Sequence, residues 1–463
     1  MTDDALRYEE VRLPASPDPL SAVARLARSG LFQPYVAYEG PGTWYFAGGT
    51  LASLRLTRDH LVTWTKGRAV RQQPCPGSPL DGVREFLATL PGPDWRAYGW
   101  TAFELAYLLA GVRDGLPDSE LLHLMVPETE VRFTPQATVL RCTDAGLAGP
   151  VADLVLGHTG SDTVPDDRVG LEVADGHNYR AAVAAAVLEI RSHALEKVIL
   201  SRTVEAPAPV DLVASYVAGR RTHAPARSFL LDLGRMCAAG FSPETVVVVS
   251  PDGQVTTQPL AGTRARTGHA DTDRRLRGEL RTDPKEVHEH AISVRLAWDE
   301  LASVCAPGTV RVAPFMTVRE RGSVQHLAST VSGTLHEGKD RWDAFAALFP
   351  AVTATGIPKA PAYDLIRQLE GEARALYSGT VLTCDSQGGL DATLVLRSIF
   401  QRGGRTWLRA GAGIVAQSLP EREHEETCEK LLSVAQCLVP SQTAEPAPSG
   451  YAPDPKAHTR ATK

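Results

Sequence analysis

The fold of this chain is best read outward from residues 409–430, RAGAGIVAQSLPEREHEETCEK. The stretch opens with the end of a predicted strand, and Gly411-Ala-Gly413 then predicts a glycine-rich turn before a helix. On that helix Glu423 and Glu426 are three residues apart, so both carboxylates project from one face. Because this acidic pair directly follows a strand and a turn, a functional site is favoured over an ordinary solvated helix face.

A second acidic pair lies upstream, in the stretch RTDPKEVHEHAISVR at 281–295. Asp283 is expected to cap a helix that begins at Pro284, and this helix carries Glu286 and Glu289 on one face. Either pair alone has an ordinary explanation, because Glu-x-x-Glu pairs are common on solvated helices and an acidic residue suits the first turn of a capped helix.

Together the two pairs predict a metal site. Four carboxylates that converged on one place would repel one another strongly unless a cation lay among them. Oxygen-only ligands suit a hard ion such as Mg²⁺, which keeps several waters and also takes oxygens from a substrate. We therefore expect a Mg²⁺-dependent enzyme that acts on an anionic substrate, with these metal ligands: Glu286, Glu289, Glu423 and Glu426.

The composition indicates which kinds of partner the protein is not expected to have. The chain has 463 residues, which allows two domains or one large fold with insertions, and 43% of them are hydrophobic. Lys and Arg number 48 and Asp and Glu 54, so the net charge is −6 and a nucleic-acid partner is not expected. The seven scattered cysteines form no Cys-x-x-Cys motif, and neither a signal peptide nor a membrane span is evident. We expect a cytoplasmic monomer without a membrane partner.

The pattern of strands and helices divides the chain into three parts. Residues 1–165 contain short strand-like runs with few helices, and we interpret them as the β-rich N-terminal part of the same fold that 166–440 completes. A polar, turn-rich segment at 157–170 is the predicted connection. The tail at 441–463 is rich in Pro, Ala and Lys and is expected to be disordered.

The predicted elements of the second part alternate between strands and helices. Helices are predicted over 179–191, 284–295, 360–369 and 420–438, and strands over 197–204, 246–249, 255–257, 309–316, 324–335, 379–384, 392–400 and 405–410.

Several single residues in these elements are candidates for chemistry, each with a plainer alternative. Lys197 begins an apolar strand, where it could reach solvent or, if buried, act as a general base. Glu244 directly precedes a predicted hairpin. The glycine and threonine of Pro259-Leu-Ala-Gly-Thr-Arg264 could let backbone N–H groups approach an anion or could only turn the chain. His326 could equally be a hydrogen-bonded core histidine.

Taken together, the motifs resemble the chorismate-utilising enzymes, the family of anthranilate, isochorismate and salicylate synthases. The matching segments follow in family order and are EKVILSR (196–202), PLAGTRAR (259–266), DPKEVHEHAISV (283–294), QHLASTVSGTL (325–335), FPAVTATGIPKAPAYDLIRQLE (349–370), YSG (377–379) and the stretch at 409–430. The resemblance implies a large α+β fold like that of anthranilate synthase component I, with antiparallel β-sheets packed against surrounding helices. It also implies chorismate as the substrate and Mg²⁺ as the cofactor.

The resemblance assigns roles residue by residue. Lys197 matches the base that activates water for attack on C2 of chorismate, and Glu244 matches the acid that protonates the departing C4 hydroxyl. His326 is grouped with these catalytic residues. The substrate-binding positions implied by the family are Gly262, Thr263, Thr353, Tyr377, Arg397, Gly411, Gly413 and Lys430, of which Tyr377 and Arg397 match residues that hold the pyruvyl carboxylate.

Three residues separate the branches of the family. Lys197 favours water over ammonia as the nucleophile, since the ammonia-using anthranilate synthases lack a lysine there. Ala261 stands where many aminodeoxychorismate synthases carry a nucleophilic lysine, so no enzyme-bound intermediate is expected. The segment around Thr353 is similar to the salicylate synthases, which convert chorismate through isochorismate to salicylate and pyruvate. An isochorismate synthase that stops at the intermediate and a catalytically silent ligand-binding homologue remain as alternatives.

Overall fold

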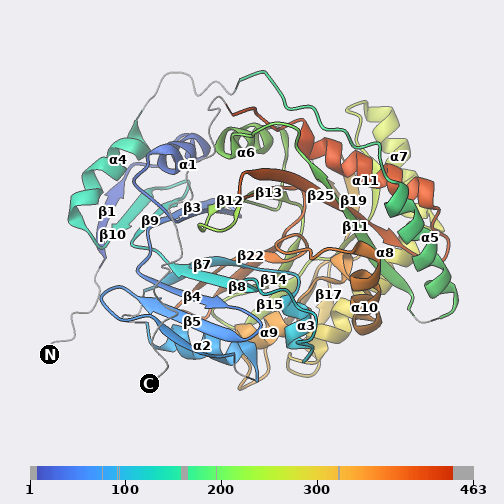
Figure 1. Ribbon diagram of the computed structural model, residues 1–463, viewed down its shortest axis with the longest axis horizontal. Helices are drawn as coiled ribbons and strands as arrows, with labels where there is room; N and C mark the ends of the chain where they lie inside the picture. The colour runs from blue at the N-terminus through green and yellow to red at the C-terminus, as the bar shows by residue number, and fades with distance from the viewer. Residues whose placement is uncertain are drawn as a thin grey trace, which may run out of the picture.

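The structure is a computed structural model that describes residues 8–75, 77–90, 92, 94–157, 165–193, 195–321 and 324–441. Half of the predicted connection at 157–170 (residues 158–164) and almost all of the tail at 441–463 lie outside the described residues. Two antiparallel sheets of eleven strands and one of three strands are surrounded by helices (Figure 1). The expected α+β class with large antiparallel sheets is confirmed.

The first large sheet, sheet 1, runs from edge to edge through β1 (Glu9–Leu13), β10 (Thr138–Cys142), β9 (Thr129–Phe133), β3 (Thr43–Gly48), β2 (Tyr35–Gly40), β12 (Arg227–Asp232), β13 (Cys237–Ser242), β24 (Ser398–Arg402), β25 (Arg405–Ile414), β11 (Lys197–Glu205) and β21 (Gly356–Ile357).

The second large sheet, sheet 2, runs through β17 (Arg311–Val312), β20 (Val331–Thr334), β15 (Gln254–Thr257), β14 (Thr245–Val249), β23 (Leu390–Leu394), β22 (Thr380–Asp385), β7 (Arg96–Thr101), β8 (Leu122–Val126), β4 (Ala52–Leu56), β5 (His60–Thr65) and β6 (Arg71–Pro74). The small sheet 3 contains β16 (Leu260–Ala265), β19 (Val324–Ala328) and β18 (Thr317–Arg321).

The helices are α1 (Pro19–Arg28), α2 (Pro79–Ala88), α3 (Leu105–Leu109), α4 (Ala148–Leu156), α5 (His177–Arg191), α6 (Leu212–Thr222), α7 (Ala270–Thr282), α8 (Pro284–Ala302), α9 (Arg341–Leu348), α10 (Lys359–Glu370) and α11 (Pro420–Ala435), with 3-10 turns at Ala145–Leu147 and Val352–Ala354. Figure 1 shows α1, α4, α6 and α11 beside sheet 1, and α2 and α9 beside sheet 2. Among the described residues, none of these helices is long and apolar enough to cross a membrane.

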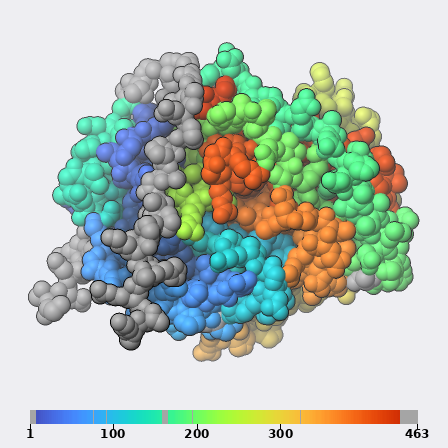
Figure 2. All heavy atoms as spheres, in the orientation of Figure 1, coloured from blue at the N-terminus to red at the C-terminus, as the bar shows by residue number. Residues whose placement is uncertain are grey.

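Each large sheet combines strands from both parts of the chain. In sheet 1 the N-terminal strands end at β2, which pairs with β12, and in sheet 2 they end at β7, which pairs with β22. Figure 2 shows N-terminal segments (blue to cyan) on the viewed face, with the cyan ones beside C-terminal segments (orange). The two parts therefore share one core, while the boundaries proposed at 165 and 440 stay a prediction.

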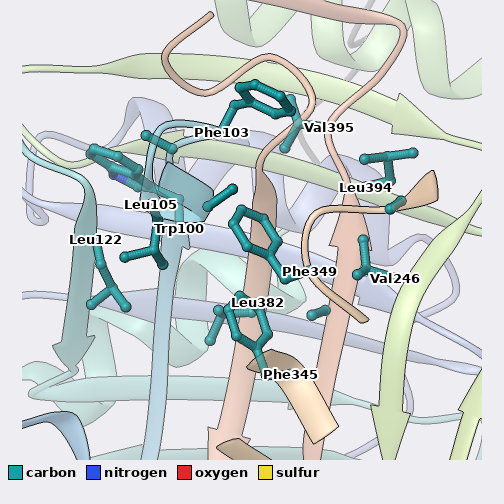
Figure 3. Close-up of a cluster of buried hydrophobic side chains, with 14 of the residues drawn as sticks. Trp100, Phe103, Leu105, Leu122, Val246, Phe345, Phe349, Leu382, Leu394 and Val395 are labelled. Atoms are coloured by element: carbon teal, nitrogen blue, oxygen red, sulfur yellow. The ribbon is translucent and has the colours of Figure 1, made fainter. Parts of the chain in front are cut away.

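The buried core near sheet 2 fixes two segments that matter for the site. Figure 3 shows Val246 of β14 and Leu394 of β23 in this core with the aromatic rings of Phe345 and Phe349, whose centroids are 4.9 Å apart. These side chains are buried. Because Val246 lies two residues after Glu244 and Leu394 lies just before the loop to β24, core packing holds the ends of both strands in place.

Four predicted elements differ from the structure. The run predicted as one strand at 324–335 forms two strands, β19 in sheet 3 and β20 in sheet 2. The run at 392–400 is not one strand, because the chain leaves β23 after Leu394 and re-enters the sheet at Ser398, with Arg397 at φ +50° between them. Apolar residues continue through this break, so the sequence pattern predicts one uninterrupted strand. Of the strand predicted at 309–316 only Arg311–Val312 forms, and the next strand begins at Thr317.

The prediction of a glycine-rich turn at Gly411-Ala-Gly413 is also wrong. Both glycines lie inside β25, and the chain turns only after Ile414. They are needed for close approach, since a Cβ on Gly411 would lie 2.6 Å from the main-chain oxygen of Leu200. A Cβ on Gly413 would lie 2.6 Å from Glu289 Oε1.

Candidate active site

One cavity collects most of the residues predicted for the site. It lies where β11 and β25 meet α8, α11 and sheet 3, and its empty volume, which includes the opening to solvent, is about 1030 Å³. The predicted residues that line it are Lys197, Glu244, Gly262, Thr263, Glu286, Glu289, His326, Thr353, Tyr377, Arg397, Gly411, Gly413, Glu426 and Lys430. Glu423 is the predicted site residue outside this lining. Residues from segments far apart in sequence are thus brought together, while their individual roles stay predictions.

Lys197 is buried at the start of β11. Its side chain is 1% exposed, and its Nζ lies 2.8 Å from Glu289 Oε1 and donates to Ser293 Oγ at 3.3 Å. The strand is flanked by β25 and β21, so both neighbours shield this end from solvent. The alternative in which Lys197 is a strand-end charge that reaches solvent is therefore excluded.

Glu244 carries a buried carboxyl group and lies directly before the first residue of β14. The residue is 3% exposed, and its main-chain oxygen accepts hydrogen bonds from Thr393 Oγ1 and the Leu394 N–H. Thr353 Oγ1 donates to Glu244 Oε1 at 2.5 Å. Burial raises the pKa of Glu244 to about 8, although the Thr353 hydrogen bond and the charge of Lys197 oppose the shift. Glu244 is thus mostly protonated at neutral pH and can donate a proton.

The two acidic pairs lie on facing helices. On α8, the Asp283 side chain accepts from the N–H groups of Lys285 and Glu286, which confirms the predicted cap. Glu286 does not fold back to that cap, because its carboxylate accepts from the Thr263 N–H at 3.2 Å and from Arg264 at 3.0 Å. The ammonium of Lys285 donates to Glu423 Oε1 of α11 at 3.1 Å and so links the two helices.

Burial and neighbouring charges shift the pKa values of the side chains in this cluster. Burial raises the pKa of Glu286 and of Glu423, against the opposing effects of Arg264 and Lys285 respectively. Burial acts the same way on Glu426, but Lys430, together with Lys285 and Arg422, outweighs it, so the pKa of that carboxyl is lowered. Burial disfavours the Lys285 ammonium, yet all four glutamates together raise its pKa.

The donor set of this cluster fits a hard cation. Glu423 is 1% exposed, and its Oε2 is buried without a hydrogen-bond partner. Such an orphaned carboxylate oxygen is costly unless a cation or a water takes it. Within the described ranges, no three His, Cys, Asp or Glu side chains already form a tight metal cage. Lysine ammonium groups pair with three of the carboxylates. A cation held here would have to compete with these lysines.

The cavity also contains a guanidinium group that is available to an anion. Arg397 donates to His326 Nε2 at 2.9 Å, and no carboxylate among the described residues pairs with it. Burial and the nearby Arg321 lower the pKa of Arg397 to about 10, so the guanidinium stays charged at neutral pH. An unpaired guanidinium in a cavity is well suited to a ligand carboxylate.

His326 lies between two other predicted site residues. Burial and the charge of Arg397 hold its pKa well below the usual value, so the ring is neutral. Its Nε2 accepts from Arg397, which leaves Nδ1 as the donor to Thr263 Oγ1 at 3.0 Å. The alternative of a hydrogen-bonded, buried histidine is thus realised, although on the wall of the cavity rather than in the core.

Backbone geometry supplies further hydrogen-bonding groups. The N–H of Ile199 donates to Thr355 and that of Ser201 to Glu370, so their partners on β25, Gly413 and Gly411, point their peptide groups away from β11. The Gly411 oxygen accepts from Lys430 Nζ at 2.8 Å. In β16, Gly262 has φ +82°, and a Cβ there would lie 3.0 Å from Glu286 Oε2.

Two residues of the site were missed in the sequence. Lys285 and Arg264 each neutralise a glutamate of the cluster. Arg264 stands in a quoted motif, but Lys285 and Glu423 are 138 residues apart and no local pattern pairs them. Proximity of Lys285 to the acidic pair on α8 was the one available signal.

Comparison with known proteins places this site in a family. The family model described as chorismate binding enzyme matches residues 34–436. A salicylate synthase of Mycolicibacterium paratuberculosis is 44% identical over 441 residues, which cover 93% of this chain and 96% of that protein.

Solved structures agree on the fold. The menaquinone-specific isochorismate synthase of Escherichia coli superposes with a TM-score of 0.72 at 23% identity, covering 93% of this chain and 94% of the other. Anthranilate synthase component I of Streptococcus pneumoniae gives a TM-score of 0.71 at 24% identity, covering 85% and 92%. The expected likeness to anthranilate synthase component I is confirmed for the fold.

Proposed function

The chain belongs to the chorismate-binding enzyme family, and we propose that within it this protein is a salicylate synthase, which converts chorismate through isochorismate to salicylate and pyruvate. The 44% identity to a salicylate synthase over 93% of the chain supports this choice. One observation from the site carries it: Lys197 and Glu244 line the same cavity as Arg397, a guanidinium without a carboxylate partner among the described residues. A single ligand in this cavity can therefore reach the proposed base, the proposed acid and the proposed anion-binding guanidinium.

In the first step, the chain moves two protons. For this step Lys197 must be a neutral amine, and it accepts a proton from water as the water oxygen adds to C2 of chorismate. Glu244 donates its proton to the hydroxyl group that leaves C4, so one water enters and one departs. The raised pKa of Glu244 supports the acid role, because a carboxyl with an ordinary pKa would already be ionised at neutral pH.

In the second step, the chain acts by positioning. Arg397 holds the pyruvyl carboxylate, helped by Tyr377 and by backbone N–H groups of Gly411 and Gly413 that point away from β11. Hydrogen then passes from C2 to the pyruvyl methylene carbon while the C3–O bond breaks, and the ring becomes aromatic. No acid or base is required, so correct placement of the side chain over the ring is the main contribution of the protein.

The remaining predicted residues support these groups. Thr353 orients Glu244 through its 2.5 Å hydrogen bond. His326 fixes the positions of the Arg397 and Thr263 side chains through one hydrogen bond to each. We assign His326 to this positioning role because its neutral ring already donates to Thr263 and accepts from Arg397. Gly262 and Lys430 line the same cavity.

The acidic cluster is proposed to hold Mg²⁺, directly or through water, with these ligands: Glu286, Glu289, Glu423 and Glu426. The orphaned Oε2 of Glu423 supports this assignment. When bound, the ion supplies positive charge that holds the ring carboxylate and stabilises charge developing there.

The proposal is tested by product analysis. Purified protein is incubated with chorismate and Mg²⁺, and the products are separated by chromatography with fluorescence detection. Salicylate and pyruvate in equal amounts are expected. Isochorismate that persists at long times would reject the second step and leave an isochorismate synthase, and unchanged chorismate would favour a silent ligand-binding homologue.

A further inference from the structure

Each glutamate of the acidic cluster is neutralised by a different basic side chain. Glu289 pairs with Lys197 at 2.8 Å and Glu426 with Lys430 at 2.7 Å. Glu286 pairs with Arg264 at 3.0 Å, and Glu423 with Lys285 at 3.1 Å. The four carboxylates are therefore already balanced by four fixed cations of the chain.

Lys285 differs from the other three cations. Lys430 also donates to the Gly411 oxygen, Arg264 also pairs with Asp283, and Lys197 also donates to Ser293. Within the described residues, the ammonium of Lys285 donates a hydrogen bond to Glu423 and to no other group, and Lys285 lines the cavity. It is thus the cation of the cluster with the fewest other bonds to lose.

Glu423 has Lys285 as its ion-pair partner, and the Ser418 side chain also interacts with its carboxylate. The residue is 1% exposed, its Oε1 accepts from Lys285, and its Oε2 has no partner. A divalent ion that took Oε2 would stand within a few ångströms of the Lys285 ammonium, where like charges repel strongly at the dielectric of a protein. Ammonium and metal ion therefore cannot both remain close to this carboxylate at low cost.

We propose that Lys285 is an internal competitor for the divalent cation: its ammonium holds α8 and α11 together in the metal-free protein and must leave Glu423 before the metal binds. This inference rests on the proposed function, since it takes the cluster to be a metal site. Its consequence is that the protein gives up metal affinity in exchange for a stable metal-free state. Lys285 is a positioning residue here, because it acts through Glu423.

The test compares three variants in the absence of chorismate. Lys285→Met removes the charge at similar side-chain length, and Lys285→Arg keeps the charge. Lys359→Met is the control: it breaks the ion pair between Lys359 of α10 and Glu300 of α8, and neither residue lines the cavity. Binding of Mg²⁺ and of Mn²⁺ is measured by isothermal titration calorimetry. Thermal unfolding midpoints are measured with and without the metal.

Lys285→Met is expected to bind Mg²⁺ at least about tenfold more tightly than wild type, since a nearby positive charge has been removed. Without metal it should unfold at a lower temperature than wild type, and Mg²⁺ should raise its midpoint by more. Lys285→Arg should bind the metal as weakly as wild type, and Lys359→Met should lose stability without any change in metal affinity.

Unchanged or weaker Mg²⁺ binding by Lys285→Met would overturn the inference and leave the proposed function standing. Should that variant fold only in the presence of Mg²⁺, the stabilising role of the ammonium is supported. Should it fail to fold at all, Lys285→Gln replaces it, and the same affinity criterion applies. Absence of metal binding in wild type and variants alike would overturn both the inference and the metal centre, while the product analysis would still decide the reaction.

Discussion

Replacing Glu244 with glutamine should change how the stability of the protein depends on pH. Burial raises the pKa of Glu244 from 4.5 to about 8, and glutamine does not titrate. A carboxyl with a raised pKa in the folded state contributes stability that is fully present below the unfolded pKa and is lost as pH rises through the folded pKa. The relevant window for wild type is therefore pH 4.5 to about 8.

The magnitude follows from the size of the shift. The difference is about 8 − 4.5, or about 3.5 pH units. At 1.36 kcal/mol per unit this amounts to about 5 kcal/mol as an upper value. Relative to wild type, Glu244→Gln should gain about 1.4 kcal/mol of unfolding free energy per pH unit across the window and then level off.

Urea unfolding of metal-free wild type and Glu244→Gln at pH 5 to 9 measures this difference, and the variant should also lose turnover. Glu429→Gln serves as the control, because the Glu429 side chain is 65% exposed. Its difference from wild type should stay flat within the same range. If the Glu244→Gln curve ran parallel to wild type at every pH, the carboxyl would not be held protonated and the assigned acid would be wrong.

Three further substitutions test other parts of the site. Lys197→Ala should abolish turnover while largely sparing Mg²⁺-dependent binding of chorismate in calorimetry, and unaltered activity would refute the assigned base. Arg397→Lys should raise KM for chorismate by about 10- to 100-fold, because an ammonium cannot grip a carboxylate through two parallel hydrogen bonds; an unchanged KM would mean that the carboxylate binds elsewhere. Gly413→Ala should lower both Mg²⁺ affinity and kcat, since its Cβ would lie 2.6 Å from Glu289 Oε1 and 3.3 Å from Lys197 Cε. Gly278→Ala, with nothing within 4 Å of its Cβ, is the matched control, and equal behaviour of the two variants would contradict the close approach.

Local signals in the sequence predicted the parts of the site that depend on local structure. Asp283 caps α8 as expected, β11 begins at Lys197, and the hairpin after Glu244 forms as β14 and β15. Capping, β-branched runs and turn residues act within a few positions, so a single sequence contains them. The approach of α8 to α11 depended instead on the reasoning that four carboxylates require a cation.

The remaining features depend on contacts between distant segments. The order of strands in the two sheets, the break at Arg397 and the pairing of Lys285 with Glu423 leave no local trace. The glycines of β25 were taken for a turn because glycine serves both turns and close approaches, and only the positions of Glu289 and Leu200 tell the two uses apart.

The central claim is that a cation among the four glutamates holds the substrate between Lys197 and Glu244. Anomalous X-ray scattering from crystals of the protein grown with Mn²⁺ and a non-reactive chorismate analogue tests it directly. One anomalous peak between the carboxylates of α8 and α11 is predicted, with the analogue's ring between the Lys197 amino group and the Glu244 carboxyl. A peak elsewhere, or an analogue bound outside the cavity that contains these two residues, would contradict the account.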